Sequence, residues 1–509
     1  MEKLYNNILF DFAARQTPID AEKVPYLQNP PEVIDVTVGR QLFVDDFLIA
    51  STTLSPTYHK AKKFEGNPIL FPKTPWEIAQ SPVACPKSGG VWYDEEEKIF
   101  KMWYEAGWLR HMCYATSTDG IHWTRPRLDE EGTNLLLKYE GYQDEKYFDG
   151  PTYLRPDSTT VFIDYSAPKS EKYKLFLRNP GGKSPAIVGV SADGIHFEKI
   201  TLTSEVYDRS TMFYNPFRKK WVYSIRSTHD NEQGWYRARD YRECDDFLQG
   251  AAWSEEDAKF WMAADSQDKP LPYIGFAPQL YNVDCVGYES LMLGMFQIMY
   301  GPENNVCEAA GVPKITELIP MYSRDGYHFS RPNRKSIINA EIHDGAWDRG
   351  YVQSVGGVTI IHGDELWIYY IGFAGDEKHA GEPWFTNGIY RNGATGLAKL
   401  RRDGFVSLDG KGSITTRKLT FTGKSSLLVN AKGGVQVFLL DEDGNELDHT
   451  TPFVGDSTGE ILHFERTDVA SLNGQTIRLR FDVDGELFAF GFADENGDCG
   501  GAHGAGLVK

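Results

Sequence analysis

The sequence contains no uninterrupted apolar run of the roughly 18 residues that a membrane-spanning helix needs. Residues 1–16 carry charges inside their one apolar stretch and lack a small-residue cleavage site, so they do not predict a secretion signal. Cysteine is scarce, with six residues and no C-x-x-C pair, which favours free thiols in a reducing cytoplasm over disulfides or a zinc site. We therefore expect a cytoplasmic protein with no membrane partner.

Positive charge is also in deficit. The chain has 53 Lys and Arg residues against 72 Asp and Glu residues, a formal net charge of −19. Nucleic-acid binding needs a basic face, so we expect no nucleic-acid partner. The H-E-x-x-H and phosphate-loop motifs are absent. No residue spacing demands a metal, and we predict neither a metal site nor a cofactor.

Aromatic residues and glycine, in contrast, are abundant. Phe, Trp and Tyr make up 13% of the 509 residues, and there are 49 glycines. This composition indicates many strands and turns rather than long helices. The length predicts two or three domains.

A short phrase, S-x-D-G-x-H-aromatic, occurs three times, at Ser117–Trp123, Ser191–Phe197 and Ser323–Phe329. Its aspartates are 74 and then 132 residues apart, so the second interval is nearly twice the first. Ser, Asp and His together resemble a catalytic set, but three copies of one active site in a single chain are implausible. An Asp-Gly turn flanked by strand-forming residues explains all three copies, and we interpret the phrase as a turn.

Pairs of strand-like segments accompany these turns and recur five times. The five pairs are Val91–Asp94 with Ile99–Tyr104, Val161–Asp164 with Tyr173–Leu177, Thr211–Asn215 with Trp221–Ile225, Tyr281–Asp284 with Leu291–Phe296, and Gly357–Ile361 with Leu366–Tyr370. Repeated antiparallel units that protect their edges by radial closure predict an all-β, five-bladed β-propeller. The competing interpretation is two consecutive β-sandwiches, which the repetition makes less favourable.

The domain boundaries follow from changes in this pattern. Residues 1–37 are expected to form an irregular or partly helical lead-in, and residues 38–410 the propeller, with Gln41–Ile49 as a first strand that completes the last blade. Shorter strands with turn signals every 8–12 residues or so predict a C-terminal β-sandwich over residues 411–497. Residues 498–509, rich in glycine and small polar types, are predicted to be a flexible tail.

The S-x-D-G-x-H-W phrases and the order of a propeller followed by a small sandwich resemble the five-bladed propeller glycosidases of glycoside hydrolase families 32, 43 and 68. The Leu427–Phe490 pattern is similar to the sandwich of family 32. That family opens its first blade with a W-M-N-D-P-N-G-type motif that carries the nucleophile, whereas the matching segment here, Ser81–Lys87, has no carboxylate. The resemblance therefore implies a divergent branch, a carbohydrate substrate and glycosidase activity.

Candidate catalytic residues are polar residues near the first strand of each blade, because these strands line the central channel. Glycoside hydrolysis needs one protonated and one ionised carboxyl group, and the resemblance implies a third that holds sugar hydroxyls. Asp149, Asp208 and Glu289 fall on three consecutive blades. We predict Glu289 as the general acid, since an aromatic residue and an apolar strand flank it. Asp208, beside Arg209, is expected to stay ionised and to bind substrate or stabilise the transition state, and Asp149 is then the nucleophile or base.

Further residues are predicted to bind substrate. These are Glu105, Arg209, Tyr288, Asp348 and Arg349. Asp348 is also a candidate replacement for a catalytic aspartate, and Glu105, at a strand end, fits a turn residue better than a binding residue. Tryptophan side chains suit stacking on sugar rings or packing between blades. Those considered are Trp76, Trp103, Trp108, Trp235 and Trp384.

The sequence thus predicts a glycoside hydrolase that releases a sugar from an oligosaccharide or polysaccharide at the propeller mouth. Two alternatives stay open: a phosphorylase in which Arg209 and Arg349 hold phosphate, and a non-catalytic sugar-binding propeller. A structural cation in the channel and a homo-oligomeric state also stay open.

Overall fold

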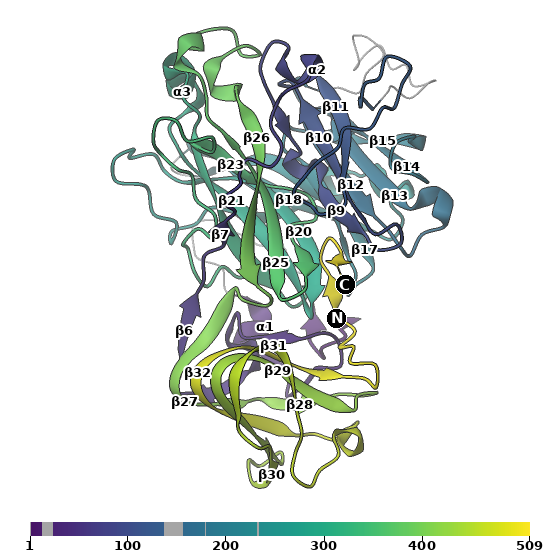
Figure 1. Cartoon of the computed structure of the whole chain (residues 1–509), viewed down its shortest axis with the longest axis vertical. Helices are drawn as coiled ribbons and strands as arrows, with labels where there is room; N and C mark the ends of the chain where they lie inside the picture. The colour runs from purple at the N-terminus through teal and green to yellow at the C-terminus, as the bar shows by residue number, and fades with distance from the viewer. Residues whose placement is uncertain (1, 13–23, 137–155, 179, 232–233, 509) are drawn as a thin grey trace.

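Five antiparallel sheets follow one another along the chain, and a further β domain packs beside them (Figure 1). The computed structural model describes residues 2–12, 24–136, 156–178, 180–231 and 234–508. The sheets form the blades of a propeller, as predicted, and we number them in chain order.

The strands of the blades have the following bounds. Blade 1 contains β8 (Ala84–Cys85), β9 (Val91–Asp94), β10 (Ile99–Ala106) and β11 (His111–Ser117). Blade 2 contains β12 (Ser158–Ile163), β13 (Tyr173–Arg178), β14 (Ser184–Ser191) and β15 (Glu198–Val206). Blade 3 contains β16 (Thr211–Asn215), β17 (Lys220–Asn231), β18 (Gly234–Cys244) and β19 (Lys259–Ala263). Blade 4 contains β20 (Gln279–Glu289), β21 (Leu291–Gly301) and β22 (Ile315–Ser323), and blade 5 contains β23 (Gly350–Ser354), β24 (Ile360–His362), β25 (Glu365–Phe373) and β26 (Gly393–Arg401).

The first strands of the blades meet in a closed ring. Strand β12 contacts β9 and the short 3-10 turn η2 (Lys87–Gly89) of blade 1, and it also contacts β16. Strand β16 contacts β20, β20 contacts β23, and β23 returns to η2. Because each blade presents its first strand to its neighbours, these strands line the axis, as in other propellers.

The S-x-D-G phrases are turns, as predicted, and each ties two neighbouring blades together. In the first copy the Asp119 carboxylate accepts hydrogen bonds from the backbone N–H groups of Ile121 and His122. Gly120 has a φ of 72°, and its carbonyl accepts a hydrogen bond of 2.9 Å from the Tyr369 hydroxyl of blade 5. In the second copy Trp103 Nε1 of blade 1 donates to the Gly194 carbonyl at 2.6 Å.

The ring is closed by an N-terminal segment, but not by the predicted one. Strand β7 (Lys62–Lys63) pairs with β26 as the outermost strand of blade 5. The expectation that Gln41–Ile49 completes this blade is wrong. Its strand β4 (Gln41–Leu42) pairs with the C-terminal sheet, where the apolar side chains of Leu42, Phe43 and Val44 are buried.

The second β domain draws on both ends of the chain. Its C-terminal strands are β27 (Val406–Thr416), β28 (Lys418–Thr420), β29 (Ser426–Leu440), β30 (Glu446–His449), β31 (Phe453–Leu462) and β32 (Arg478–Ala493). Its N-terminal strands are β3 (Val33–Asp35), β4, β5 (Ile49–Thr52) and β6 (Ser55–Tyr58). The predicted boundary at residue 38 is therefore displaced, because residues 33–58 pair with the C-terminal strands and not with a blade.

Long strands of this domain fold over to form two facing layers. Phe481 and Phe490 lie on the same strand, β32, where nine extended residues would span about 30 Å. Their ring centroids are only 5.3 Å apart, so the strand turns back on itself. Gly485, at φ 148°, lies between them and faces Gly410 and Gly433 on the adjacent strands. This glycine row permits the fold-over, and the curved strands are visible in Figure 1.

The C-terminal residues join three blades, so the predicted flexible tail at 498–509 is wrong. Strand β33 (Ala502–His503) pairs with β20 of blade 4, and β34 (Leu507–Val508) pairs with β24 of blade 5. Between them the Ala505 carbonyl accepts a hydrogen bond of 2.9 Å from the backbone N–H of Tyr93 in blade 1. Glycine and other small residues let this segment approach the neighbouring backbone closely. The same composition is typical of flexible tails, which explains the wrong prediction.

The remaining elements are short. They are β1 (Glu2–Lys3), β2 (Leu9–Phe10), α1 (Pro25–Gln28), α2 (Pro75–Ile78) and α3 (Asn304–Ala310). None of the helices in the described residues is long and apolar enough to cross a membrane.

Deletion of residues 501–509 is expected to lower the thermal unfolding midpoint, because it removes the strands that join blades 1, 4 and 5. The matched control is His503→Gln, which loses only the half-exposed contact to Glu95 and keeps the backbone pairing. Calorimetry would measure both variants. A deletion variant that melts with the wild type would contradict the structural role of this segment.

Candidate active site

One mouth of the channel is formed where the first strands of the blades begin. Asp157 directly precedes β12, Arg209 lies just before β16, Tyr281 is near the start of β20, and Tyr351 is near the start of β23. Blade 1 contributes Lys87, because its inner strand is interrupted by η2 between β8 and β9. These residues are far apart in the sequence, and the ring brings them together.

Arg209 connects blades 2 and 3 at this mouth. It adopts a left-handed backbone conformation with φ 61°, and its backbone N–H donates to Ser158 Oγ at 2.6 Å. Its guanidinium donates to Asp157 Oδ1 at 3.0 Å, while Asp157 Oδ2 accepts from Arg178 at 2.6 Å. Both oxygens of Asp157 are thus engaged by guanidinium groups, so this carboxylate orients arginines.

Asp208, predicted as an ionised carboxylate, lies at the same mouth and reaches solvent. Its side chain is 36% exposed and pairs with Arg226 at 2.6 Å. Burial by itself would raise the pKa of Asp208, but Arg226 and Arg209 lower it below its usual value. Asp208 is therefore the charged carboxylate of the mouth that is not enclosed by protein.

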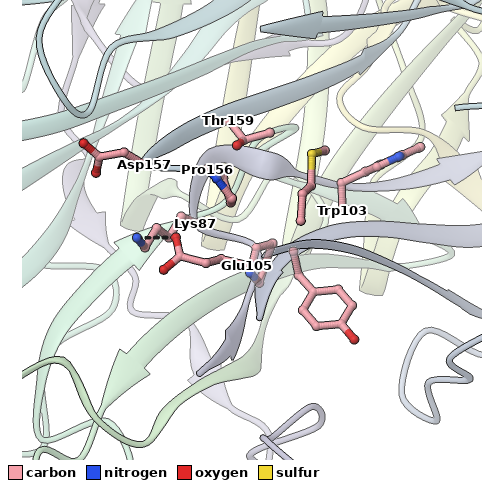
Figure 2. A pocket seen from close by; sticks show the side chains of 9 residues that line it. Lys87, Trp103, Glu105, Pro156, Asp157 and Thr159 are labelled. Atoms are coloured by element: carbon pink, nitrogen blue, oxygen red, sulfur yellow. Dashed lines mark ion pairs between the residues drawn. The ribbon is translucent and has the colours of Figure 1, made fainter. Parts of the chain in front are cut away.

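Lys87 and Glu105 form a buried pair beneath the mouth (Figure 2). Lys87 Nζ lies 2.5 Å from Glu105 Oε2 and 3.9 Å from the ring centroid of Trp108. Burial raises the pKa of Glu105 and lowers that of Lys87, since neither charge is solvated. Both pKa shifts favour the uncharged forms of the two side chains. Glu105 and Lys87 can therefore share one proton without carrying opposite full charges.

A small cavity lies beside this pair. Its volume of about 10 Å³ is close to the space that one water molecule needs. Glu105, Asp157 and Thr159 are among its lining residues, and Figure 2 shows them around it. The cavity therefore connects the proton-bearing pair of blade 1 with the aspartate of blade 2.

Tyr281 faces several cations on the other side of the mouth. Its hydroxyl accepts a hydrogen bond of 3.2 Å from Lys314 Nζ and lies 3.3 Å from the hydroxyl of Tyr351. The guanidinium of Arg237 is 5.5 Å from its ring centroid. Burial would raise the pKa of Tyr281, but Lys314 and Arg237 lower it to about 8. Tyr281 is thus a phenol that loses its proton unusually readily.

Asp284 lies three residues beyond Tyr281 on β20, inside the channel. Its Oδ2 accepts hydrogen bonds from Ser354 Oγ at 2.5 Å and from Asn282 Nδ2 at 3.0 Å. Burial raises the pKa of Asp284 to about 6, in spite of these bonds.

Of the five tryptophans considered for sugar stacking, two are well exposed. Trp235 is 55% exposed and lies next to Arg237, and Trp384 is 44% exposed, with its ring 6.3 Å from that of Trp108.

The other tryptophans are less accessible. Trp103 and Trp108 are buried, and the ring of Trp108 stacks on that of Tyr390 at a centroid distance of 4.0 Å. The partly buried Trp76 donates from Nε1 to Asn134. The exposed pair suits sugar stacking, and the others serve packing.

Glu289, predicted as the general acid, lies elsewhere. It ends β20, eight residues beyond Tyr281, which is roughly 25 Å along an extended strand. Its carboxylate accepts hydrogen bonds from the backbone of Arg40 at 3.1 Å and from Arg402 at 2.9 Å. Its neighbour Tyr288 donates to Asp403 at 2.5 Å. Both residues belong to a buried network between propeller and sandwich, so the predicted catalytic and binding roles do not fit their positions.

The remaining predicted residues are also accounted for. Asp348 is buried and pairs with Lys63 of β7 at 2.7 Å, so it anchors the closing strand instead of facing the mouth. Arg349 pairs with Asp344 and Glu377 in surface loops. Asp149 lies outside the described residues.

Several residues of the mouth were missed in the sequence. Arg237 and Arg239 are two apart on β18 and so share one strand face, which is a readable signal. Lys87 was not predicted as a site residue because the segment Ser81–Lys87 has no carboxylate. Its partner Glu105 supplies one from β10, which pairs with β8. Lys314 carries no local signal, because only the fold brings it to Tyr281.

Among the described residues, no group of three or more His, Cys, Asp or Glu side chains is arranged to hold a metal ion. All six cysteines are free.

No family model and no curated protein matches the sequence. Solved structures do show similarity. An N-acetylgalactosamine deacetylase from F. plautii is 13% identical with a TM-score of 0.42, over 70% of this chain and 96% of that one. A β-1,2-mannobiose phosphorylase from Listeria innocua is 12% identical with a TM-score of 0.41, over 67% and 96%. A glycoside hydrolase family 32 protein from Bifidobacterium adolescentis is 10% identical with a TM-score of 0.36, over 88% and 81%.

Glu289→Gln is expected to lower the stability of the protein by about 3 kcal/mol and to leave turnover of any substrate unchanged. The carboxylate balances Arg40 and Arg402 in a buried network far from the mouth. Chemical unfolding and steady-state kinetics would measure the two effects. Loss of turnover in a variant that remains folded would restore Glu289 as a catalytic candidate.

Asp284→Asn is expected to stabilise the protein at pH 8 by roughly 2–3 kcal/mol, and by little at pH 4. Because the folded-state pKa is raised to about 6, the ionised carboxylate destabilises the fold above that pH, and the penalty disappears below the pKa of the unfolded chain. Thermal melts across this pH range measure the difference. Asp344→Asn, at an exposed loop, is the control and should show no such pH dependence.

Proposed function

We propose that this protein is a glycoside hydrolase that releases a sugar from an oligosaccharide or polysaccharide at the Asp208 mouth of the propeller. The observation that carries the proposal is a pair of carboxyl groups with opposite pKa shifts. The pKa of Asp208 is lowered by arginines and that of Glu105 is raised by burial. Glycoside hydrolysis requires one ionised and one protonated carboxyl group, and environments that push the two pKa values apart supply them.

The roles follow from exposure and protonation. Asp208, which reaches solvent, serves as the ionised nucleophile or base, or stabilises the positive charge of the transition state. Glu105 holds the proton for the leaving oxygen, shared with Lys87 at 2.5 Å. The exposed rings of Trp235 and Trp384 offer stacking surfaces for the sugar. Asp208 thereby takes the role of nucleophile or base that the sequence predicted for Asp149, which lies outside the described residues.

A phosphorylase is the second candidate, and the cations of the mouth favour it. Arg349 is engaged by Asp344 and Glu377, so it no longer fits the predicted phosphate-binding role. Arg237, whose guanidinium lies 5.5 Å from the Tyr281 ring centroid and has no carboxylate within ion-pair distance among the described residues, fits that role better. Turnover that depends on added phosphate distinguishes this reaction from hydrolysis.

Asp208→Asn and Glu105→Gln are each expected to lower kcat on a cleaved glycoside by about 10²–10⁴-fold, because each removes one carboxyl function of the reaction. A panel of aryl glycosides and oligosaccharides first identifies a substrate, and steady-state kinetics then compares the variants.

The control is Asp484→Asn, which removes an exposed carboxylate of the sandwich that pairs with Lys411 and should leave kcat unchanged. Full activity in both mouth variants would refute the assignment of these carboxyl groups. Sugar binding with no turnover in the wild type would favour a non-catalytic propeller.

A further inference from the structure

Three cations at the mouth, Arg237, Arg239 and Lys314, have no carboxylate within ion-pair distance among the described residues. In contrast, Arg226 pairs with Asp208, and Arg178 pairs with Asp157. Positive charge therefore exceeds negative charge around Tyr281, although the chain as a whole has a net charge of −19.

Arg237 is held in place by neutral contacts. Its backbone N–H donates to Gln279 Oε1 at 2.9 Å, and its guanidinium lies 5.7 Å from the ring centroid of Trp235 and 5.5 Å from that of Tyr281. Its buried Nε has no hydrogen-bond partner in the described part of the chain. The guanidinium is thus positioned by aromatic rings, and its capacity to donate is not used up.

Lys314 is a buried cation in an aromatic surround. Its Nζ donates to the Tyr281 hydroxyl at 3.2 Å and to Asn304 Oδ1 at 2.5 Å. The rings of Tyr281, Tyr351 and Tyr390 lie 4.9, 5.2 and 5.7 Å from it. Below pH 8, where Tyr281 keeps its proton, these groups stabilise the ammonium ion by dipoles and ring faces, and none of them neutralises it.

Arg239 adds positive charge from beneath. It is fully buried and donates to the Tyr281 carbonyl at 2.8 Å and to Asn282 Oδ1 at 3.1 Å. All of its hydrogen-bond acceptors in the described residues are uncharged oxygens. Its charge therefore adds to that of Arg237 and Lys314.

Buried cations without a counter-charge are costly, and an anion that binds beside them relieves the cost. A guanidinium fork and an ammonium point charge are the usual partners of carboxylate, sulfate and phosphate groups. Neutral sugar hydroxyls would leave the same charges unbalanced.

We propose that Arg237 and Lys314, beside Tyr281, form an oxyanion-binding subsite of the mouth. The oxyanion is either a carboxylate or sulfate substituent of the bound sugar, or free phosphate that acts as a co-substrate. The subsite deepens the proposed function and rests on it for the identity of the ligand as a sugar, while binding of the oxyanion itself requires no turnover.

Calorimetric titration tests the subsite with D-galacturonate, D-glucuronate, inorganic sulfate and inorganic phosphate against D-galactose and D-glucose. At least one oxyanion is expected to bind 10-fold or more tightly than the neutral sugars, with affinity that falls as salt rises. Arg237→Gln and Lys314→Met are each expected to weaken that binding by 10-fold or more.

Lys411→Met is the matched control, since it removes an exposed cation of the sandwich and should leave binding unchanged. If Lys314→Met fails to fold, Arg237→Gln, at a partly exposed position, still decides the outcome. Equal affinity for neutral and charged probes, or full affinity in the folded variants, would overturn the subsite.

The same titrations identify the source of the oxyanion. Tight binding of uronates alone assigns the subsite to an acidic sugar, and tight binding of phosphate with phosphate-dependent turnover assigns it to a co-substrate. Oxyanion binding with no turnover in any assay would refute the proposed enzyme activity and leave the subsite intact.

Discussion

Closure of the ring is the constraint on which the rest of this structure depends. Five blades can hold their first strands around one axis only if blade 5 is joined to blade 1. Here both ends of the chain contribute. Strand β7 becomes the outer strand of blade 5, and the C-terminal strands β33 and β34 join blades 4 and 5 while the Ala505 carbonyl bonds to blade 1. Because the chain passes from the second β domain to the propeller and back, each domain takes strands from both ends of the chain. The buried network around Glu289 holds the two domains together.

Closure also creates the chemistry of the mouth. Each inner strand delivers one or two polar residues to the same place, and none of them has its function alone. Asp157 orients Arg209, Glu105 and Lys87 hold a proton between them, and Arg237 and Lys314 lower the pKa of Tyr281. The pKa values that matter are therefore properties of the assembled ring, since burial and neighbouring charges set them.

The fold could largely be predicted from the sequence, and the site only in part. The S-x-D-G turns and the alternating strands revealed five blades because both are local patterns. Asp208 could be placed near the mouth because it lies three residues before an inner strand. The position of Glu289 was predicted wrongly because the sequence pattern is the same at both ends of a strand. No local feature of the sequence indicates which end of β20 faces the mouth. Gln41–Ile49 was misplaced because its apolar residues fit either of two cores.

The sequence by itself determined the β architecture, the number of blades and the turns between their strands, because hydrogen bonding and side-chain alternation act over a few residues. Tertiary structure decided which N-terminal strand closes the ring, that the glycine-rich C-terminus is ordered, and which charges meet at the mouth. These depend on contacts between residues hundreds of positions apart, such as Lys63 with Asp348 and Tyr93 with Ala505. Chain direction and ring closure set those contacts, and neither is visible in a local pattern.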